Sequence, residues 1–483
     1  MLGSKLHSLL SSLSQTQLNN FRRFIHSPYF NESEVIIAFG EHLITQLLKP
    51  VQEAEQLDKK VVWTYLYENK PFQDAQFRSL ASTMLALLYK FLHVEVCHQN
   101  PLSEKLAAMG QLKAPEMEKH FKGLTRQFNR LKEEKPAEGA EQFHQLYKFH
   151  YLHHKQLEER GKKQTDFHSL ETADNYLDAY YYLEKLKHYC DALGYQSFLS
   201  HQPKINLPGG FKYSLEESAF LDFPLIKAYY LVAKLLESPE EEELFTQLKD
   251  LLFNYHAQFI KDDQLTLFIH LTNYCIHKKI NIGRADFYPA LFEVYQKAIE
   301  TGILLNNGYL QPQDYKNIIT VGLQVKAFKW VENFTQEYAQ LLPEDNQENA
   351  VTYNLAKVYF SQQEYEKVIE KLREVEYEDR VYALGSKLML LRTYYELGEF
   401  IALDSLIDSF RIYLRRDQKI SREVKQQYLN VLRFVKKLSK VRPRDMEALQ
   451  KIRIQVEKCN ALAAKKWVLE KIEELGPGVK ASV

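Results

Sequence analysis

Glycine and proline are scarce in this chain, with 17 and 15 among its 483 residues. Both shares fall below the usual values of roughly 7% and 5%. Sandwiches, barrels and nucleotide-binding α/β folds spend glycine on turns and phosphate loops, and the sequence contains no G-x-x-x-x-G-K-[ST] or G-x-G-x-x-G motif. The shortage therefore favours helices and argues against the common phosphate-binding enzyme folds.

Cysteine is equally sparse. The four cysteines are Cys97, Cys190, Cys275 and Cys459, and no two of them have C-x-x-C spacing. Zinc clusters and redox dithiols need closely spaced ligands, so this pattern argues against both. We expect free thiols in a reducing cytoplasm, and no metal or cofactor.

The chain also lacks an excess of either charge, because Lys plus Arg and Asp plus Glu both number 63. No global attraction to nucleic acid or to a membrane follows from that balance. The N-terminus lacks the continuous apolar block of a secretory signal. No run of about 18 apolar residues is evident either, which predicts a cytoplasmic protein without a membrane span.

Hydrophobic residues make up 45% of the chain and charged residues 26%, which is enough apolar surface for a buried core. Apolar residues recur at helical spacing along most of it, and no long segment shows the period of two that marks a strand. Ser14 with Gln17, and Asn31 with Glu34, have the pattern of a helix start. The sequence predicts an all-α fold. Its clearest early helices span 58–68, 74–99, 101–110, 115–134, 140–160 and 170–194.

Two breaks divide the predicted helices. The first is Glu133 to Ala140, and the second is Gln202 to Tyr213, where Leu207 to Gly210 reads as a turn. We therefore expect an N-terminal helical region at 1–134, a helical hairpin or connector at 141–202 and an array of helical repeats at 214–475.

The clearest internal repeat lies at 350–410. Tyr359 aligns with Tyr394, and Tyr365 aligns with Phe400, both at an offset of 35 residues. Each unit reads as a helical hairpin whose two apolar stripes face each other. A hairpin this small cannot bury both faces alone, so it must stack on neighbouring units.

These two units resemble tetratricopeptide repeats, which have a period of 34 residues. The resemblance rests on Leu355, Ala356 and Tyr359 in the first helix and on Tyr365, Val368 and Leu372 in the second. The pattern departs from the family at Thr352, Val368, Leu391 and Leu403, and neither unit ends in a clear proline. The resemblance implies an α-solenoid of stacked antiparallel helix pairs, in looser or differently angled stacking.

The whole chain also resembles an uncharacterised bacterial family of helical repeat proteins. The residues that carry this second resemblance are Leu13-Ser14, Phe21, Phe24, Ser27 to Asn31 and Lys466 to Ile472. It implies an architecture and no chemistry.

A solenoid lines its groove with the first helix of each pair, which would place Asn354, Lys357, Phe360, Arg392 and Tyr395 there. Lys357 and Arg392 occupy equivalent positions, which would suit an acidic or carboxylate-bearing ligand. We expect both charges to stay hydrated in the free protein. The predicted function is a non-enzymatic scaffold that binds a protein or peptide; ordinary surface residues are the alternative for these five positions.

A second hypothesis concerns charge. The stretch from Arg411 to Arg444 has 12 basic and 2 acidic residues, while Glu332 to Arg380 has 12 acidic and 5 basic residues. One interpretation is that the two stretches pair with each other, and another is that the basic stretch binds an acidic protein. The alternative function is a nucleic-acid-binding or transcription-related regulator, with Arg415, Arg416, Lys436 and Lys437 in its basic patch.

Signals for catalysis are weak. His150, His154 and Glu158 have the spacing of one helix face, which is compatible with zinc, but there is no H-E-x-x-H motif. No G-x-S-x-G elbow or isolated acid–base pair is present. A solvated or partly packed helix face is the favoured interpretation, and the sequence predicts no enzyme.

Overall fold

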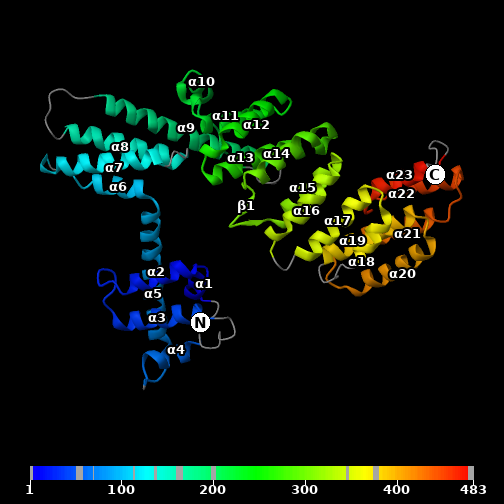
Figure 1. Cartoon of the computed structure of the whole chain (residues 1–483), viewed down its shortest axis with the longest axis horizontal. Helices are drawn as coiled ribbons and strands as arrows, with labels where there is room; N and C mark the ends of the chain where they lie inside the picture. Colours follow the sequence, from blue (N-terminus) through cyan, green and yellow to red (C-terminus); the bar gives the residue numbers. More distant parts are fainter. Residues whose placement is uncertain are drawn as a thin grey trace. The chain divides into compact units, whose positions relative to one another are not determined.

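The computed structural model describes residues 4–49, 58–68, 70–112, 115–134, 139–158, 167–196, 203–343, 347–373 and 380–476. The chain is 79% helical, so the all-α prediction is confirmed. In the described ranges the strands are limited to one hairpin, formed by β1 (Leu305–Asn306) and β2 (Tyr309–Leu310). Its turn holds Asn307 and Gly308 at φ 51° and 85°, a conformation that Asn-Gly adopts readily. Figure 1 shows the course of the helices.

The fold divides into two compact units, Met1–Glu184 and Lys185–Val483, and the division falls within helix α9. The helices of the first unit are α1 (Lys5–Ser11), α2 (Gln15–Ile25), α3 (Glu34–Leu47), α4 (Lys59–Leu66), α5 (Asp74–Gln99), α6 (Pro101–Met109), α7 (Glu118–Glu134), α8 (Ala140–Glu158) and the first part of α9 (His168–Gln196). The helices predicted in this region all exist, with ends shifted by a few residues.

Two apolar clusters hold the first unit together. One joins α1 to α5 around Phe21, Phe39 and Trp63, which are at most 1% exposed. The other joins α6, α7 and α8, where the rings of Phe128 and Phe149 stack 4.3 Å apart. These large rings bury much apolar surface, which helps to offset the entropy cost of ordering the helices.

Two predicted helix starts have different outcomes. Ser14 caps α2 as expected: its Oγ accepts the backbone N–H of Gln17, and the Gln17 side chain accepts the N–H of Ser14. The start at Asn31 is wrong, because Ser33 is the cap and accepts the N–H of Ile36. Asn31 instead donates its side-chain amide to the carbonyl of Ile25, which fastens the preceding turn.

One described helix, α5, has the length and the apolar composition to cross a membrane. The predicted absence of a membrane span stays a prediction. The same composition occurs in core helices, and α5 places Phe77, Met84, Leu88 and Phe91 in the first unit's core. A single helix of this kind is weak evidence for a membrane span.

The second unit starts within α9 and continues through a series of shorter helices. Its α-helices are α10 (Phe211–Glu216), α11 (Pro224–Glu237), α12 (Glu242–Tyr255), α13 (Lys261–Asn273), α14 (Tyr288–Glu300), α15 (Pro312–Gln324), α16 (Phe328–Glu337), α17 (Gln347–Ser361), α18 (Tyr365–Arg373), α19 (Arg380–Glu396), α20 (Phe400–Arg416), α21 (Arg422–Leu438), α22 (Met446–Glu457) and α23 (Lys465–Glu474). The turn predicted at Leu207 to Gly210 precedes α10: Gly210 has φ 78°, and Phe211 donates its N–H to the carbonyl of Pro208.

From α11 to α23, each helix packs against the next one in the chain. Alternate helices also touch, in the pairs α11 with α13, α15 with α17, α17 with α19 and α21 with α23. Figure 1 shows these helices following one another from green to red. Such an order is typical of chains that are built from helical hairpins.

The same turn connects three of these hairpins. In each, a residue with positive φ follows the first helix: Lys326 at 58°, Gln363 at 63° and Gly398 at 71°. The next N–H then donates to a carbonyl five residues earlier, from Ala327 to Gly322, from Glu364 to Tyr359 and from Glu399 to Tyr394, each at 2.9 Å. This is a Schellman-type helix end. It recurs at spacings of 37 and 35 residues, so the repeat exists in the backbone as well as in the sequence.

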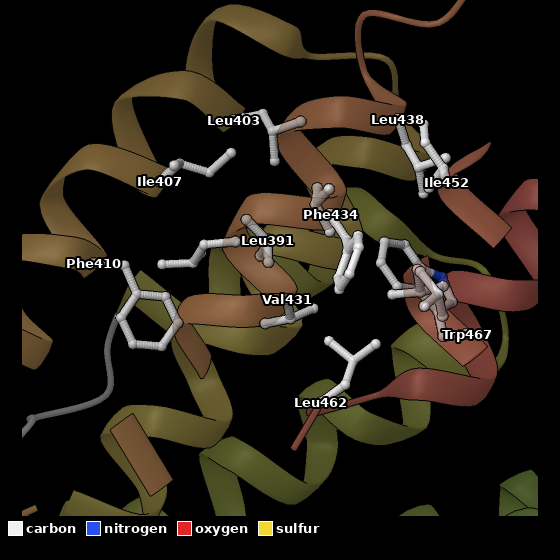
Figure 2. Packing of buried hydrophobic residues seen from close by; sticks show 14 of the residues in the cluster. Leu391, Leu403, Ile407, Phe410, Val431, Phe434, Leu438, Ile452, Leu462 and Trp467 are labelled. Carbon is white, nitrogen blue, oxygen red and sulfur yellow. The ribbon is translucent and has the colours of Figure 1, made fainter. Parts of the chain in front are cut away.

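The last helices enclose the largest apolar cluster of the C-terminal part. Figure 2 shows Leu391, Leu403, Ile407 and Phe410 of α19 and α20 facing Val431 and other residues of α21, with Ile452 and Trp467 closing the far side. Most of these side chains are fully buried. Leu391 and Leu403 of the second predicted hairpin are therefore core residues, whereas Phe400, which aligns with Tyr365, is 48% exposed.

The predicted domain limits are harder to compare with the structure. Residues 135–138 of the first predicted linker, and residue 202 at the second predicted limit, lie outside the described residues. The three predicted regions stay a prediction beside the two compact units.

Candidate binding surface

Three side chains of α17 share one face of that helix. Tyr353, Lys357 and Phe360 follow one another at i, i+4 and i+7, which brings them into line. Gly385 of α19 leaves room for the Tyr353 ring, because a Cβ at that glycine would lie 2.5 Å from the tyrosine oxygen. The helices thus approach closely here, and the aromatic ring fills the gap.

Lys357 reaches across to α15. Its Nζ donates to Oγ1 of Thr320 at 3.2 Å. Lys316 lies one turn before Thr320, and Thr320 in turn donates to the Lys316 carbonyl. Burial, together with the nearby charge of Lys316, lowers the pKa of Lys357 from 10.5 to about 8. Neither lysine forms an ion pair with any residue in the described part of the chain.

Arg392 of α19 lies at the other end of this face. Its guanidinium carbon is 4.3 Å from the centre of the Phe360 ring and 5.3 Å from that of Trp467. Burial lowers the pKa of Arg392, against the opposing effect of Glu396 and of other nearby groups. Its Nε is buried without a hydrogen-bond partner. Arg392 is thus a cation held between two rings.

Tyr395 extends the same surface toward α23. Its ring meets Trp467 edge-on at 5.5 Å, and burial raises its pKa to about 12. Trp467 donates its Nε1–H to Glu396 at 2.7 Å, and Lys471 pairs with the other oxygen of Glu396 at 2.7 Å. The C-terminal helix is therefore fixed to α19 by a tryptophan and an ion pair.

We call this surface the α17 face; it consists of Lys316, Thr320, Tyr353, Lys357, Phe360, Arg392 and Tyr395. Four of the five residues predicted to line a groove belong to it. The structure brings together Lys357, Phe360, Arg392 and Tyr395.

Asn354 does not belong to the α17 face. Its side chain is 1% exposed and donates to the carbonyl of Ala350, one turn earlier. The prediction that Asn354 projects into a groove is wrong. It is adjacent to Tyr353 in the sequence, and one step of 100° along a helix turns it from the surface into the core.

The expected hydration of the two groove charges is also wrong. Lys357 and Arg392 are both half-buried, and burial lowers the pKa of each. A repeat offset of 35 residues correctly identifies the positions as equivalent. It carries no information about how closely the neighbouring helices crowd around them.

Sequence reasoning missed Lys316, Thr320 and Trp467. A signal existed for Thr320, which precedes Lys357 by the same 37 residues that separate the repeated turns at Lys326 and Gln363. Trp467 lies 71 residues after Glu396, its hydrogen-bond partner, so no local sequence pattern could have predicted that contact.

The basic segment lies on α20, α21 and the turns beside them. Arg415 and Arg416 are exposed at the end of α20. Lys436 pairs with Asp404 at 3.3 Å, and Lys437 donates to the neutral side chain of Gln455 at 2.6 Å. Where the structure describes side chains, no ion pair links this segment to the acidic stretch that begins at Glu332, so the predicted pairing between the two stretches is not observed.

The histidine-rich face of α8 is packed rather than open. His154 lies 3.4 Å from Glu158, but the His150 ring stacks on Tyr176 at 5.6 Å. Burial, aided by Lys132, His153 and His168, lowers the pKa of His150 to about 4. Within the described residues, no three His, Cys, Asp or Glu side chains come together in a way that could hold a metal ion.

A separate cavity of about 280 Å³ lies beside the π-helical turn Tyr274–Lys279. His270 lines it, and burial lowers the pKa of that histidine to about 4, so the ring is neutral at pH 7. Asp191 and His277 supply further polar atoms at its edge. The lining is otherwise largely apolar.

Comparison with known proteins gives no relative for this chain. No family model matches it. No curated protein and no solved structure matches it either. The resemblance to tetratricopeptide repeats, and that to a bacterial family, therefore stay hypotheses drawn from the residues themselves.

Proposed function

We propose that this chain is a non-catalytic binding protein that holds an acidic segment of a partner protein on the α17 face. In this proposal, α11 to α23 form a solenoid of tetratricopeptide-like helix pairs, and α15, α17 and α19 present the binding surface. The three identical turns and the contacts between alternate helices support that arrangement.

The observation that carries the proposal is the position of Lys357. Its ammonium lies near the positive charge of Lys316, and among the described residues no carboxylate pairs with it. Two like charges at a half-buried position cost free energy, which an anionic ligand would recover. Perturbed charges of this kind are concentrated at functional sites.

The aromatic residues of the α17 face define the rest of the ligand. Phe360 lies against the Arg392 guanidinium, and Tyr353 and Tyr395 are further rings of the same face. Arg392 can donate two parallel hydrogen bonds to a carboxylate. A segment that alternates acidic and apolar side chains would match this order. The partner is therefore expected to be a protein or peptide rather than a small anion.

The test uses fluorescence anisotropy of the full chain with a labelled oligoglutamate peptide and its oligoglutamine analogue. We expect the glutamate peptide to bind and the glutamine peptide not to bind. The variant Lys316→Met/Lys357→Met should weaken binding by roughly tenfold or more, equivalent to about 1.4 kcal/mol. Equal binding by this variant and the wild type would contradict the proposal, as would no binding by the wild type.

A charge-matched control separates a local effect from a global one. Lys122 and Lys466 have side chains that are 61% and 93% exposed, and neither lies on the α17 face. Lys122→Met/Lys466→Met removes the same total charge and should leave peptide affinity within about twofold. Affinity should also fall from about pH 7 to about pH 9, because Lys357 loses its proton over that range.

A further inference from the structure

Six basic side chains lie along a single face of α21. They are Arg422, Lys425, Arg433, Lys436, Lys437 and Lys440, which we call the basic stripe. At about 100° per residue, their positions fall within an arc of about 120°. Lys440 lies in the turn just after the helix. Within the helix the stripe is about 22 Å long, from Arg422 to Lys437 in 15 steps of about 1.5 Å.

The opposite face of α21 is occupied. Val431, Phe434, Val435 and Leu438 are at most 1% exposed and belong to the C-terminal core, as Figure 2 shows for three of them. The helix is therefore held in one orientation, and its basic side points away from the core. The stripe is a fixed feature of the fold rather than a property of a tail.

Most of the stripe is not neutralised from within. Lys436 pairs with Asp404 at 3.3 Å. Arg422, Lys425 and Lys440 have no ion pair with a described residue. The one acidic residue of α21, Glu423, is about 100° away from the line that Arg422 begins.

Further cations, together with Asp417 and Asp445, flank α21 in the sequence. Arg415, Arg416 and Lys419 are exposed where α20 leads into α21, and Arg442 and Arg444 are exposed after it. The cations of the stripe form two groups along α21, separated by Gln426 and Leu429 and without an acidic residue on the same arc. A row of this length matches a charged polymer better than a single small anion.

The side chains near the cations indicate which charged polymer the stripe would bind. The stripe carries no exposed aromatic ring, since Tyr428 is half-buried against Phe410 at 5.6 Å, so bases of a single strand would find no stacking partner. A membrane surface would call for apolar side chains beside the cations, but those of α21 are used in the core. A duplex offers regularly spaced phosphates to Lys and Arg.

We propose that the basic stripe of α21 binds the sugar–phosphate backbone of double-stranded nucleic acid without sequence preference. Arg and Lys would contact phosphates along one groove edge, and no side chain of the stripe is placed to read bases. This surface is separate from the α17 face, and the inference does not depend on the function proposed for that face.

The experiment measures binding of the full chain to labelled DNA and RNA duplexes of about 20 base pairs, between about 50 and 200 mM salt. With five to six phosphate contacts, the logarithm of affinity should fall against the logarithm of salt with a slope of about −5. Affinity should then drop by on the order of a thousandfold over that range. The two duplexes distinguish DNA from RNA as the source of the phosphates.

The test variant replaces Arg422, Lys425, Arg433 and Lys440 by Gln, and the slope should fall in magnitude by about 3 to 4. The control replaces Arg78, Lys122, Lys451 and Lys466 by Gln, four cations whose side chains are 61% to 93% exposed elsewhere. The control should keep the wild-type slope. Circular dichroism should show the same helix content in both variants, because every replaced side chain faces solvent at least in part.

Several results would overturn the inference. One is absence of duplex binding at the lowest salt, and another is an equal loss in the control variant. Tighter binding to phosphatidylserine vesicles, or to oligoglutamate through the stripe, would assign the surface to membranes or to acidic proteins instead. Lys316→Met/Lys357→Met should bind the duplex like the wild type, so failure of this inference and failure of the proposed peptide site are distinguishable.

Discussion

Lys357 keeps an ammonium group in surroundings that disfavour its charge. Burial and the charge of Lys316 lower its pKa to about 8, so the folded state binds this proton more weakly than the unfolded state does. The charged Lys357 therefore lowers the free energy of unfolding at neutral pH, and this loss is recovered as the pH rises from about 8 to about 10.5.

Lys357→Met should leave the free energy of unfolding at pH 7 unchanged or increase it, because methionine keeps the apolar stem without the charge. The gain should fade toward about pH 10.5, where the wild-type lysine is neutral in both states. Urea unfolding followed by circular dichroism measures both. A loss above about 1 kcal/mol at pH 7 would show that the charge has a stabilising partner.

The same residue should react early with amine-directed reagents. At pH 8 about half of the Lys357 side chains are neutral, whereas a lysine of ordinary pKa is neutral in well under 1% of molecules. Competitive labelling with mass spectrometry reads each lysine separately, and an oligoglutamate peptide should slow the reaction at Lys357. Labelling of Lys357 at the rate of Lys466 would contradict the lowered pKa.

The repeated turn after the first helix of each pair allows glycine to be compared with another residue at the same backbone position. Gln363 and Gly398 occupy equivalent positions, with φ 63° and 71°. A side chain in this left-handed region costs roughly 1–2 kcal/mol, which glycine avoids. No atom lies within 4 Å of the position that a Cβ on Gly398 would take, so a substitution there would report the backbone alone.

We expect Gly398→Ala to destabilise the chain by about 1 kcal/mol and Gln363→Gly to be neutral or stabilising by up to about 1 kcal/mol. Alanine at 398 adds strain, whereas glycine at 363 relieves it. The gain at 363 is reduced because glycine also increases the entropy of the unfolded chain. Chemical denaturation of both variants tests this. Two shifts of the same sign would mean that the turns are not equivalent.

The C-terminal helix is held by the group around Trp467, which is 5% exposed and donates to Glu396. Trp467→Ala should cost about 3–5 kcal/mol because it leaves a large cavity. Glu396→Gln should cost less, about 1–3 kcal/mol, because it keeps an acceptor for the indole but removes a charge beside Lys471. Denaturation midpoints that do not move would show that α23 is not docked on α19.

The elements were largely predictable, and their contacts were not. Helical periodicity and the Ser14–Gln17 capping box are local signals, which is why the helices and the start of α2 follow from the sequence. The choice of Ser33 over Asn31 as a cap depends on where the preceding turn ends. The basic stripe is visible on a helical wheel, but whether it meets an acidic partner depends on packing between helices.

The site was only partly predictable for a related reason. Repeat equivalence placed Lys357 and Arg392 on related positions, but their burial depends on Lys316, Phe360 and Trp467. At Asn354 the predicted helix face was displaced by one residue: the neighbouring Tyr353 lies on the surface that Asn354 was expected to line.

For the molecule as a whole, each compact unit contains a histidine that burial keeps neutral, His150 in the first and His270 in the second, both with a pKa of about 4. The folded-state pKa is below the unfolded value near 6.5, so their contribution to stability is complete above about pH 6.5 and is lost as the pH falls toward 4. Acid should therefore destabilise both units.

The nearly buried His270 allows a quantitative expectation. Its shift corresponds to at most about 3 kcal/mol of stability lost between about pH 6.5 and pH 4. Thermal melts of His270→Leu should depend less on pH over this range than melts of the wild type, while the exposed His98, replaced by Gln, serves as the control. The same pH dependence in all three proteins would contradict a buried neutral ring.

The order of packing in the second unit has a consequence for how the chain behaves under load. From α11 to α23 each helix rests on its successor, so the contacts that hold a helix pair are made by residues close in the sequence. Pulling on such a chain should release the pairs one after another rather than all at once. The indole of Trp467 joins segments that are 71 residues apart, so α23 and α19 should be the last of the C-terminal helices to separate. When the force is removed, the helix pairs should re-form quickly, because each pair closes only a short loop.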